Sequence, residues 1–124
     1  MSSDRSQRVM DRYFELMGRD ADFSSCFTKD VTWSVVDTGA VITGPEPVRD
    51  YIVDLHAGLL DWQSRTFVVG EDHVFLEGDA ATADGGTDRA HYCVAYDLDG
   101  ELIAAMRCYG PGAARRATAP GSPR

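Results

Sequence analysis

Two charged side chains stand in otherwise apolar segments, and they are the first candidates for chemistry. Asp37 follows a strand-like run that begins at Trp33, and the two residues share one face of that strand. In an apolar hollow, burial would raise the pKa of the Asp37 carboxyl, which could then serve as a general base. Arg107 lies in a second apolar run, where its guanidinium could bind a substrate oxyanion. Together they indicate acid–base chemistry on a small molecule.

Both residues also have a structural interpretation. Asp37 could begin a turn through Thr38 and Gly39, because aspartate is common in turns. Arg107 could form an ion pair with Asp37 or Glu77, since a guanidinium in a covered strand needs a carboxylate partner or water. The sequence leaves these interpretations open.

Two histidines are candidates for proton transfer near neutral pH. His91 lies in a predicted strand, and His56 sits beside the apolar stripe of a predicted helix. Each is a lone histidine, which could equally be a satisfied core or surface group. No two histidines and a carboxylate share metal-ligand spacing, and there is no Gly-rich phosphate loop, so we expect neither a metal site nor a cofactor.

The stretch from Arg89 to Tyr109 must position several of these residues, and it reads as two strands joined by a tight turn. We expect the turn at Asp97-Leu98-Asp99-Gly100, since an Asp-Gly pair between two apolar runs is a strong signal for a hairpin. Neither face of the hairpin is plainly polar, so both faces are expected to be covered. An arginine and three tyrosines in this hairpin suggest the wall of a pocket: Arg107, Tyr92, Tyr96 and Tyr109.

The remaining segments alternate helical and strand-like patterns. An apolar stripe with helical spacing predicts a helix from Arg5 to Gly18. The order predicts an α+β fold in which a cone-shaped, curved antiparallel (mixed) sheet wraps around three N-terminal helices. The other expected elements are helices over Asp22–Phe27 and Glu46–Gly58, and strands over Val31–Asp37, Ala40–Thr43, Trp62–Val69 and His73–Ala83.

Composition limits the classes of function. The chain has 124 residues, with one domain expected over 1–111 and a disordered Gly-, Pro-, Ala- and Arg-rich tail over 112–124. Its net charge of −8 argues against nucleic acid and anionic membrane surfaces as partners. With no signal-peptide pattern and no apolar run near the ~18 residues that span a bilayer, we expect a cytoplasmic protein that does not bind membranes.

Three cysteines, without a CxxC motif, fit neither a disulfide framework nor a zinc site. They are Cys26, Cys93 and Cys108. We expect reduced, buried thiols, although Cys93 and Cys108 lie in paired strands and could meet across the hairpin.

Three stretches carry a resemblance to a known family. They are RYFELMGRDADFSSCFTKDVTW, the helix TGPEPVRDYIVDLH and the closing strand DGELIAAMRCYGP. They resemble the cone-shaped superfamily typified by nuclear transport factor 2 and ketosteroid isomerase, particularly its SnoaL-like polyketide cyclase branch. The similarity covers about residues 5 to 111, and it implies the fold more firmly than the reaction.

The resemblance also suggests site residues. Tyr13 falls where ketosteroid isomerases have their oxyanion-hole tyrosine. The position of their catalytic aspartate falls on Val35, with Asp37 as the nearest carboxylate on that face, and their second acid falls near Tyr92 or His91. The same register would point these six side chains into the cone: Trp33, Asp37, Tyr92, Tyr96, Arg107 and Tyr109.

The sequence thus predicts a cofactor-independent small-molecule enzyme that uses acid–base chemistry in an apolar cone pocket, of the polyketide cyclase, isomerase, dehydratase or epoxide hydrolase type. The predicted catalytic residues are Asp37, Arg107, Tyr13 and His91, and the predicted substrate-binding residues are Trp33, His56, Tyr92, Tyr96 and Tyr109. The resemblance implies an apolar, oxygenated substrate, polyketide- or steroid-like, and a homodimer. The alternative is a non-catalytic module of the same fold that binds a small ligand or serves dimerisation.

Overall fold

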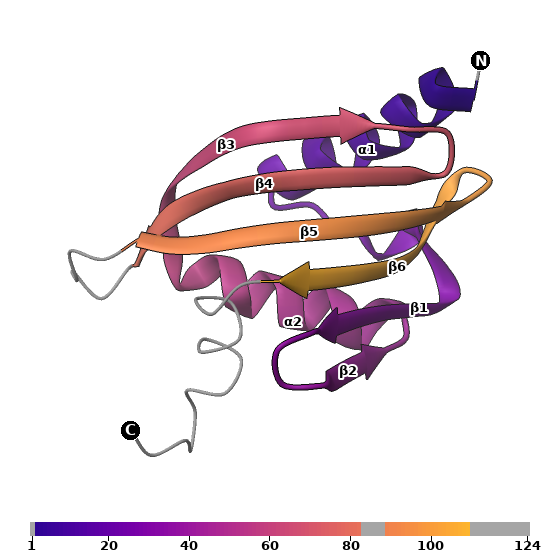
Figure 1. The fold of residues 1–124 in the computed structure, drawn as a ribbon. Coiled ribbons are helices and arrows are strands. Elements are labelled where there is room, and N and C mark those ends of the chain that lie inside the picture. Colours follow the sequence, from indigo (N-terminus) through magenta and orange to yellow (C-terminus); the bar gives the residue numbers. More distant parts are fainter. Residues whose placement is uncertain (1, 83–88, 110–124) are drawn as a thin grey trace.

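A six-stranded sheet curves around two helices (Figure 1). The computed structural model describes residues 2–82 and 89–109. The sheet has the order β2-β1-β6-β5-β4-β3, in which β6 runs parallel to β1 and all other neighbours are antiparallel. The predicted α+β fold with a curved, mixed sheet is confirmed. The strands are β1 (Phe27–Val35), β2 (Ala40–Thr43), β3 (Leu59–Val69), β4 (His73–Thr82), β5 (Arg89–Asp99) and β6 (Leu102–Tyr109).

Both helices lie on the same side of the sheet (Figure 1), where their apolar stripes are buried. Helix α1 (Ser2–Gly18) buries Val9, Met10 and Tyr13, and helix α2 (Pro45–Ala57) buries Val48, Ile52 and Leu55. These residues recur every three or four positions, so each helix presents one apolar face to the sheet. Pro45 begins α2, where its missing N–H leaves no hydrogen bond unmade.

Only two of the three predicted helices form. The segment predicted as a helix over Asp22–Phe27 contains a single 3₁₀ turn, Ser24–Cys26, and the chain then enters β1 at Phe27. The Asp22 carboxylate accepts a hydrogen bond from the backbone N–H of Ser24 at 3.0 Å. This local turn satisfies the backbone without a helix, which is a common role for aspartate.

The register of the strands decides which side chains face the helices. Trp33 pairs with Met106, Met106 with Tyr96, and Tyr96 with Val74, so these four residues form one row across four strands on the inner face. Each is at most 4% exposed. Because neighbouring residues of a strand alternate between faces, Arg107 belongs to the outer face. The hairpin of β5 and β6 therefore has one face in the core and one outside.

A glycine allows β3 to approach the rest of the sheet closely. Gly78 of β4 lies opposite both Ser64 and Tyr92, next to shifts in the β3–β4 register. A Cβ atom at Gly78 would lie 2.2 Å from the backbone oxygen of Gln63 and 2.7 Å from the Tyr92 hydroxyl. The absence of a side chain at Gly78 therefore leaves room for the Tyr92 ring and for the irregular course of β3.

The outer face carries ion pairs and a few exposed apolar side chains. Arg65 and Arg89 both bind the Asp79 carboxylate, and Val68 and Phe75 lie side by side, 56% and 45% exposed. Within the described ranges no helix is long and apolar enough to cross a membrane. The predicted tail at residues 112–124 falls outside the described residues.

The cysteines of the hairpin do not meet. Cys93 pairs with Tyr109 on the outer face, whereas Cys108 pairs with Val94 on the inner face. Both are free thiols, as is the buried Cys26. Burial raises the pKa of the Cys108 thiol to about 12, so this cysteine is an inert core residue.

Candidate functional site

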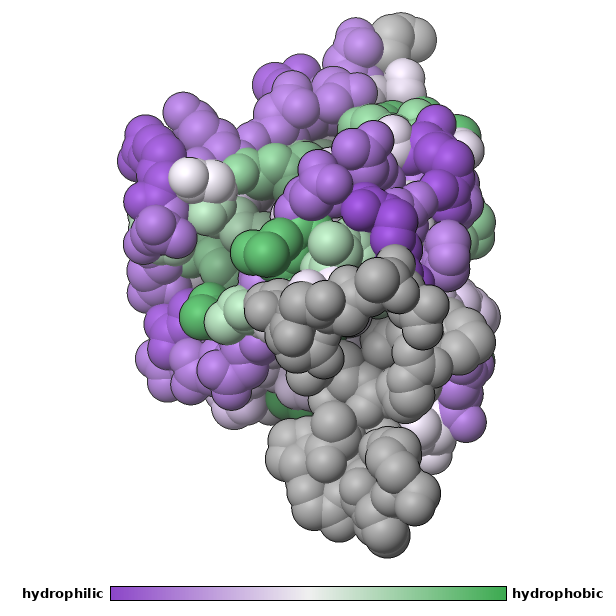
Figure 2. Space-filling view, turned by 90° about the vertical axis from the view of Figure 1, so that its left-hand side faces the viewer, coloured by the Kyte–Doolittle hydropathy of each residue, from purple (hydrophilic) through white to green (hydrophobic). Residues whose placement is uncertain are grey.

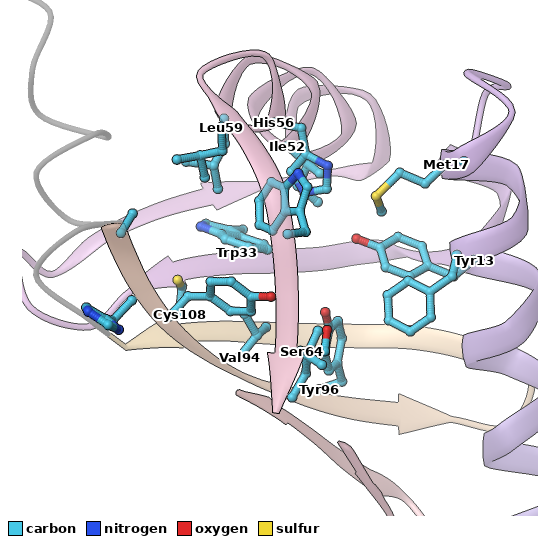
Figure 3. A pocket seen from close by; sticks show the side chains of 18 residues that line it. Tyr13, Met17, Trp33, Ile52, His56, Leu59, Ser64, Val94, Tyr96 and Cys108 are labelled. Carbon is cyan, nitrogen blue, oxygen red and sulfur yellow. The ribbon is translucent and has the colours of Figure 1, made fainter. Parts of the chain in front are cut away.

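A cavity of about 320 Å³ lies between the two helices and the inner face of the sheet (Figure 3). Helix α1 contributes Tyr13 and Met17, α2 contributes Ile52 and His56, and the sheet contributes aromatic residues that include Trp33. On the side of the molecule where β3 begins, apolar residues gather within a hydrophilic surround (Figure 2). The volume is in the range of small-molecule sites.

The wall of this cavity is apolar and aromatic. None of the described residues that line it is an aspartate, glutamate, lysine or arginine. Its polar groups are tyrosine and serine hydroxyls, two indoles, two imidazoles and one thiol. Because burying an unpaired charge in such surroundings is costly, the cavity suits an uncharged ligand.

His56 is the half-buried group in this wall that can carry a proton near neutral pH. It lies in the last turn of α2, one turn after the buried Ile52, so its ring reaches the cavity from the edge of the apolar stripe. Burial lowers the pKa of His56, and the imidazole is therefore neutral at pH 7. No described residue hydrogen-bonds to its ring nitrogens, and neither nitrogen is sealed from water. A lone pair is thus free to accept a proton.

Trp62 connects His56 to the sheet. Its ring lies 4.6 Å from the His56 ring and 5.4 Å from the Tyr92 ring, measured between centroids. Trp62 is 40% exposed, so this row of three aromatic rings passes from the cavity to the surface. The neighbouring indole, tilted by 45° to the imidazole, limits the positions that the imidazole can adopt.

Two tyrosine hydroxyls are available as hydrogen-bond donors. Tyr13 and Tyr96 are at most 4% exposed and their ring centroids lie 6.2 Å apart. Neither hydroxyl bonds to a described residue, and the Tyr13 hydroxyl points into the cavity (Figure 3). Burial raises the pKa of both phenols, so they stay protonated and can donate to an oxyanion.

The prediction that Asp37 faces the cone is wrong. Strand β1 ends at Val35, and Asp37 is an exposed residue of the turn that follows. The backbone N–H groups of Thr38 and Gly39 both donate to the Val35 oxygen, at 3.2 and 2.9 Å. Because the chain turns directly after Val35, the alternation of the strand does not extend to Asp37.

The predicted inward orientation of Arg107 and Tyr109 is also wrong. Both lie on the outer face, where the Arg107 guanidinium donates to both oxygens of Asp97, at 2.5 and 3.1 Å. This ion pair holds the pKa of the Asp97 carboxyl below its usual value. The partner of Arg107 is therefore Asp97 rather than Asp37 or Glu77, and Glu77 pairs with Arg65.

Six of the predicted site residues line the cavity: Tyr13, Trp33, His56, His91, Tyr92 and Tyr96. Of these, His91 is an exposed residue that alternates with Tyr92 along β5. Trp62, Ser64 and Met17 also line the cavity and were not predicted from the sequence. For Trp62 the sequence does hold one signal: the residues that follow this tryptophan in its strand are polar, which is typical of an aromatic side chain that is only partly buried.

The fold is that of a cone-shaped α+β domain with an apolar cavity between its helices and its sheet. The chain belongs to the SnoaL-like domain family, whose model matches residues 10–106. This match confirms the resemblance on which the sequence analysis relied. No curated protein matches the sequence.

Solved structures share the fold at low sequence identity. A steroid delta-isomerase from Pseudomonas aeruginosa has a TM-score of 0.78 and 12% identity, over 91% of this chain and 86% of that one. A protein proposed to be a SnoaL-like polyketide cyclase from Shewanella putrefaciens has a TM-score of 0.65 and 12% identity, over 84% and 88%. A de novo designed protein with a curved β-sheet has a TM-score of 0.72 and 17% identity, over 89% and 88%. These likenesses concern the fold alone.

Proposed function

We propose that this chain is a cofactor-independent enzyme that transfers a proton on a flat, uncharged, largely apolar molecule bearing a carbonyl oxygen. The observation that carries the proposal is the neutral imidazole of His56 in the wall of an aromatic cavity. A half-buried base whose pKa lies below neutrality is unprotonated at pH 7 and ready to accept a proton. His56 thereby takes the role that the sequence analysis gave to Asp37 or His91.

The proposed step is an enolisation. His56 accepts a proton from a carbon next to the carbonyl group, and the electron pair of the broken C–H bond forms a carbon–carbon double bond. The carbonyl oxygen becomes an oxyanion, to which the hydroxyls of Tyr13 and Tyr96 donate hydrogen bonds. Return of the proton to another carbon completes an isomerisation, and attack of the enolate on a second carbonyl completes an aldol-type cyclisation.

Two further facts support this assignment. SnoaL-like and related folds include proteins named as a steroid isomerase and, by proposal, a polyketide cyclase, and both names imply chemistry next to a carbonyl group. The cavity wall offers aromatic rings for a flat ligand and no described charged group to oppose a neutral one. A polyketide- or steroid-like molecule has these properties.

The test uses β-tetralone, an uncharged bicyclic ketone with acidic C–H bonds. The protein should accelerate deuterium incorporation next to the carbonyl group in D₂O, followed by NMR. His56→Gln should abolish the acceleration, whereas Asp37→Asn and Arg107→Met, which alter residues outside the cavity, should retain it. Equal acceleration by the wild type and His56→Gln would refute the proposed base.

Non-catalytic binding of the same class of ligand is the second candidate. It is favoured by one observation: no described lining residue is a carboxylate, so His56 has no acidic partner in the wall to orient it. β-Tetralone that binds, as measured by calorimetry, without accelerated exchange would support this alternative over the enzyme.

A further inference from the structure

His56 borders a second hollow as well as the cavity. This hollow, of about 370 Å³, lies between the end of α1 and the outer side of α2, and Asp20, Phe23, Val53 and Ala57 contribute to its wall. Val53 is 50% exposed, and Asp20 and Ala57 are also exposed, so the hollow opens to solvent.

Three side chains separate the two spaces. Met17, Ile52 and His56 line both the cavity and the second hollow. Ile52 is 1% exposed and apolar, and Met17 has no group that titrates. His56 is therefore the member of this partition that can carry a proton from one side to the other.

The surroundings of the imidazole permit such a transfer. Its ring nitrogens bond to no described residue and both remain accessible to water, as described above. The Trp62 indole covers the ring from the side of β3, which leaves the α1 side open toward the hollow. Asp20 contributes a carboxylate to the wall of that hollow, and its negative charge attracts a proton that leaves His56 in that direction.

We propose that His56 exchanges its proton with solvent through this second hollow while a ligand fills the cavity. The inference rests on the proposed function. The imidazole takes the proton of the ligand's C–H bond, the imidazolium N–H then gives that proton to a water molecule in the hollow, and neutral imidazole returns. Deuterium from the solvent would reach the ligand by the reverse path.

The test measures acylation of His56 by diethyl pyrocarbonate, quantified by mass spectrometry of peptides. The reagent attacks unprotonated imidazole, and the exposed His73 serves as the internal control. Ala57→Trp, at an exposed position of α2, narrows the second hollow. Ser64→Trp, at an exposed position of β3, obstructs the cavity and does not touch the hollow.

With saturating β-tetralone, His56 of the wild type should react at least about tenfold faster than His56 of Ala57→Trp. If the two acylation rates differ by less than this, the second route is overturned. The same holds if β-tetralone slows the acylation of His56 in the wild type to the rate found in Ala57→Trp. In Ser64→Trp the new side chain obstructs the cavity, so this variant is assayed without ligand. Its His56 should be acylated at about the rate of the ligand-free wild type. A much slower acylation would overturn the second route without reference to β-tetralone. Failure of β-tetralone to bind would count against the proposed function alone.

Discussion

The imidazole of His56 packs on the indole of Trp62, with ring centroids 4.6 Å apart and ring planes tilted by 45°. This contact joins the last turn of α2 to the beginning of β3. Because Trp62 also contacts Tyr92, the His56 ring is held against the sheet from which the cavity is built. The position of His56 thus depends on three elements: α2, the strand β3 that follows it in the chain, and the more distant strand β5.

The pH dependence of stability should report His56. Folding lowers the pKa of His56 below its ordinary value near 6.5, so the unfolded chain binds more protons than the folded one between the two pKa values. The free energy of unfolding should therefore rise with pH in that window, by at most about 1.4 kcal/mol per pH unit for one proton, and this contribution should be complete above about pH 6.5.

Urea unfolding from pH 5 to 8 measures this dependence. The free energy of unfolding of the wild type should rise with pH below about pH 6.5, and this rise should be missing in His56→Gln. The control variant Ala57→Gln, which keeps His56, should show the same rise as the wild type. A difference that is flat over the whole range would show that folding does not shift the pKa of His56.

Removal of the Tyr13 hydroxyl should affect the ligand but not the fold. Tyr13→Phe deletes a group that bonds to no described residue, so its free energy of unfolding should stay within about 0.5 kcal/mol of the wild type. A hydrogen bond lost to the ligand should weaken β-tetralone binding by about 0.5–1.5 kcal/mol, roughly two- to thirteenfold, in calorimetry. Tyr51→Phe is the matched control, since Tyr51 does not line the cavity.

Arg107 should prove to be a structural residue. Arg107→Met breaks its ion pair with Asp97 on the outer face, and since both side chains are about one-third exposed, the cost should be about 1 kcal/mol or less. Because the pair lowers the pKa of Asp97, this contribution should be present above the ordinary pKa of aspartate and be lost as the pH falls below it. Thermal unfolding at pH 7 and pH 3 measures the loss, and a large drop in tetralone exchange would contradict the structural role.

A side chain at Gly78 should destabilise the fold. The Cβ of Gly78→Ala would meet the Gln63 backbone oxygen and the Tyr92 hydroxyl, and overpacking of this kind costs about 1–3 kcal/mol. Gly18→Ala is the control, because no atom lies within 4 Å of the corresponding Cβ at the end of α1. Equal midpoints of urea unfolding for the two variants would show that β3 can shift to accommodate the methyl group.

Most of the fold could be predicted from local signals. The Asp99-Gly100 pair and the apolar runs around it predicted the β5–β6 hairpin, and helical spacing predicted α1 and α2. The predicted turn, Asp97 to Gly100, is wrong in position: β5 continues to Asp99, and the chain turns at Gly100 and Glu101. The resemblance to the cone-shaped family also implied that Trp33, Tyr92 and Tyr96 face inward, and they do. What the sequence could not show was the register between β5 and β6, and a shift of one residue moves Arg107 from one face to the other.

The remaining errors in the predicted site have local causes. Asp37 belongs to a turn because the backbone N–H groups of Thr38 and Gly39 bond to Val35, and turn chemistry ended the strand before alternation could apply. Trp62 was missed because the pairing of β3 shifts near it, and such irregularities leave no periodic pattern in the sequence. The importance of His56 emerged from its neighbours in space rather than from its own helix.

Titration of the histidine ring protons by NMR, with and without β-tetralone, shows whether His56 is a low-pKa imidazole in contact with the ligand. We expect His56 to titrate below the ordinary histidine pKa of about 6.5 and its resonances to shift when β-tetralone is added. A His56 pKa at or above the ordinary value, together with resonances that ignore bound β-tetralone, would contradict the assignment of this imidazole as the base of the pocket.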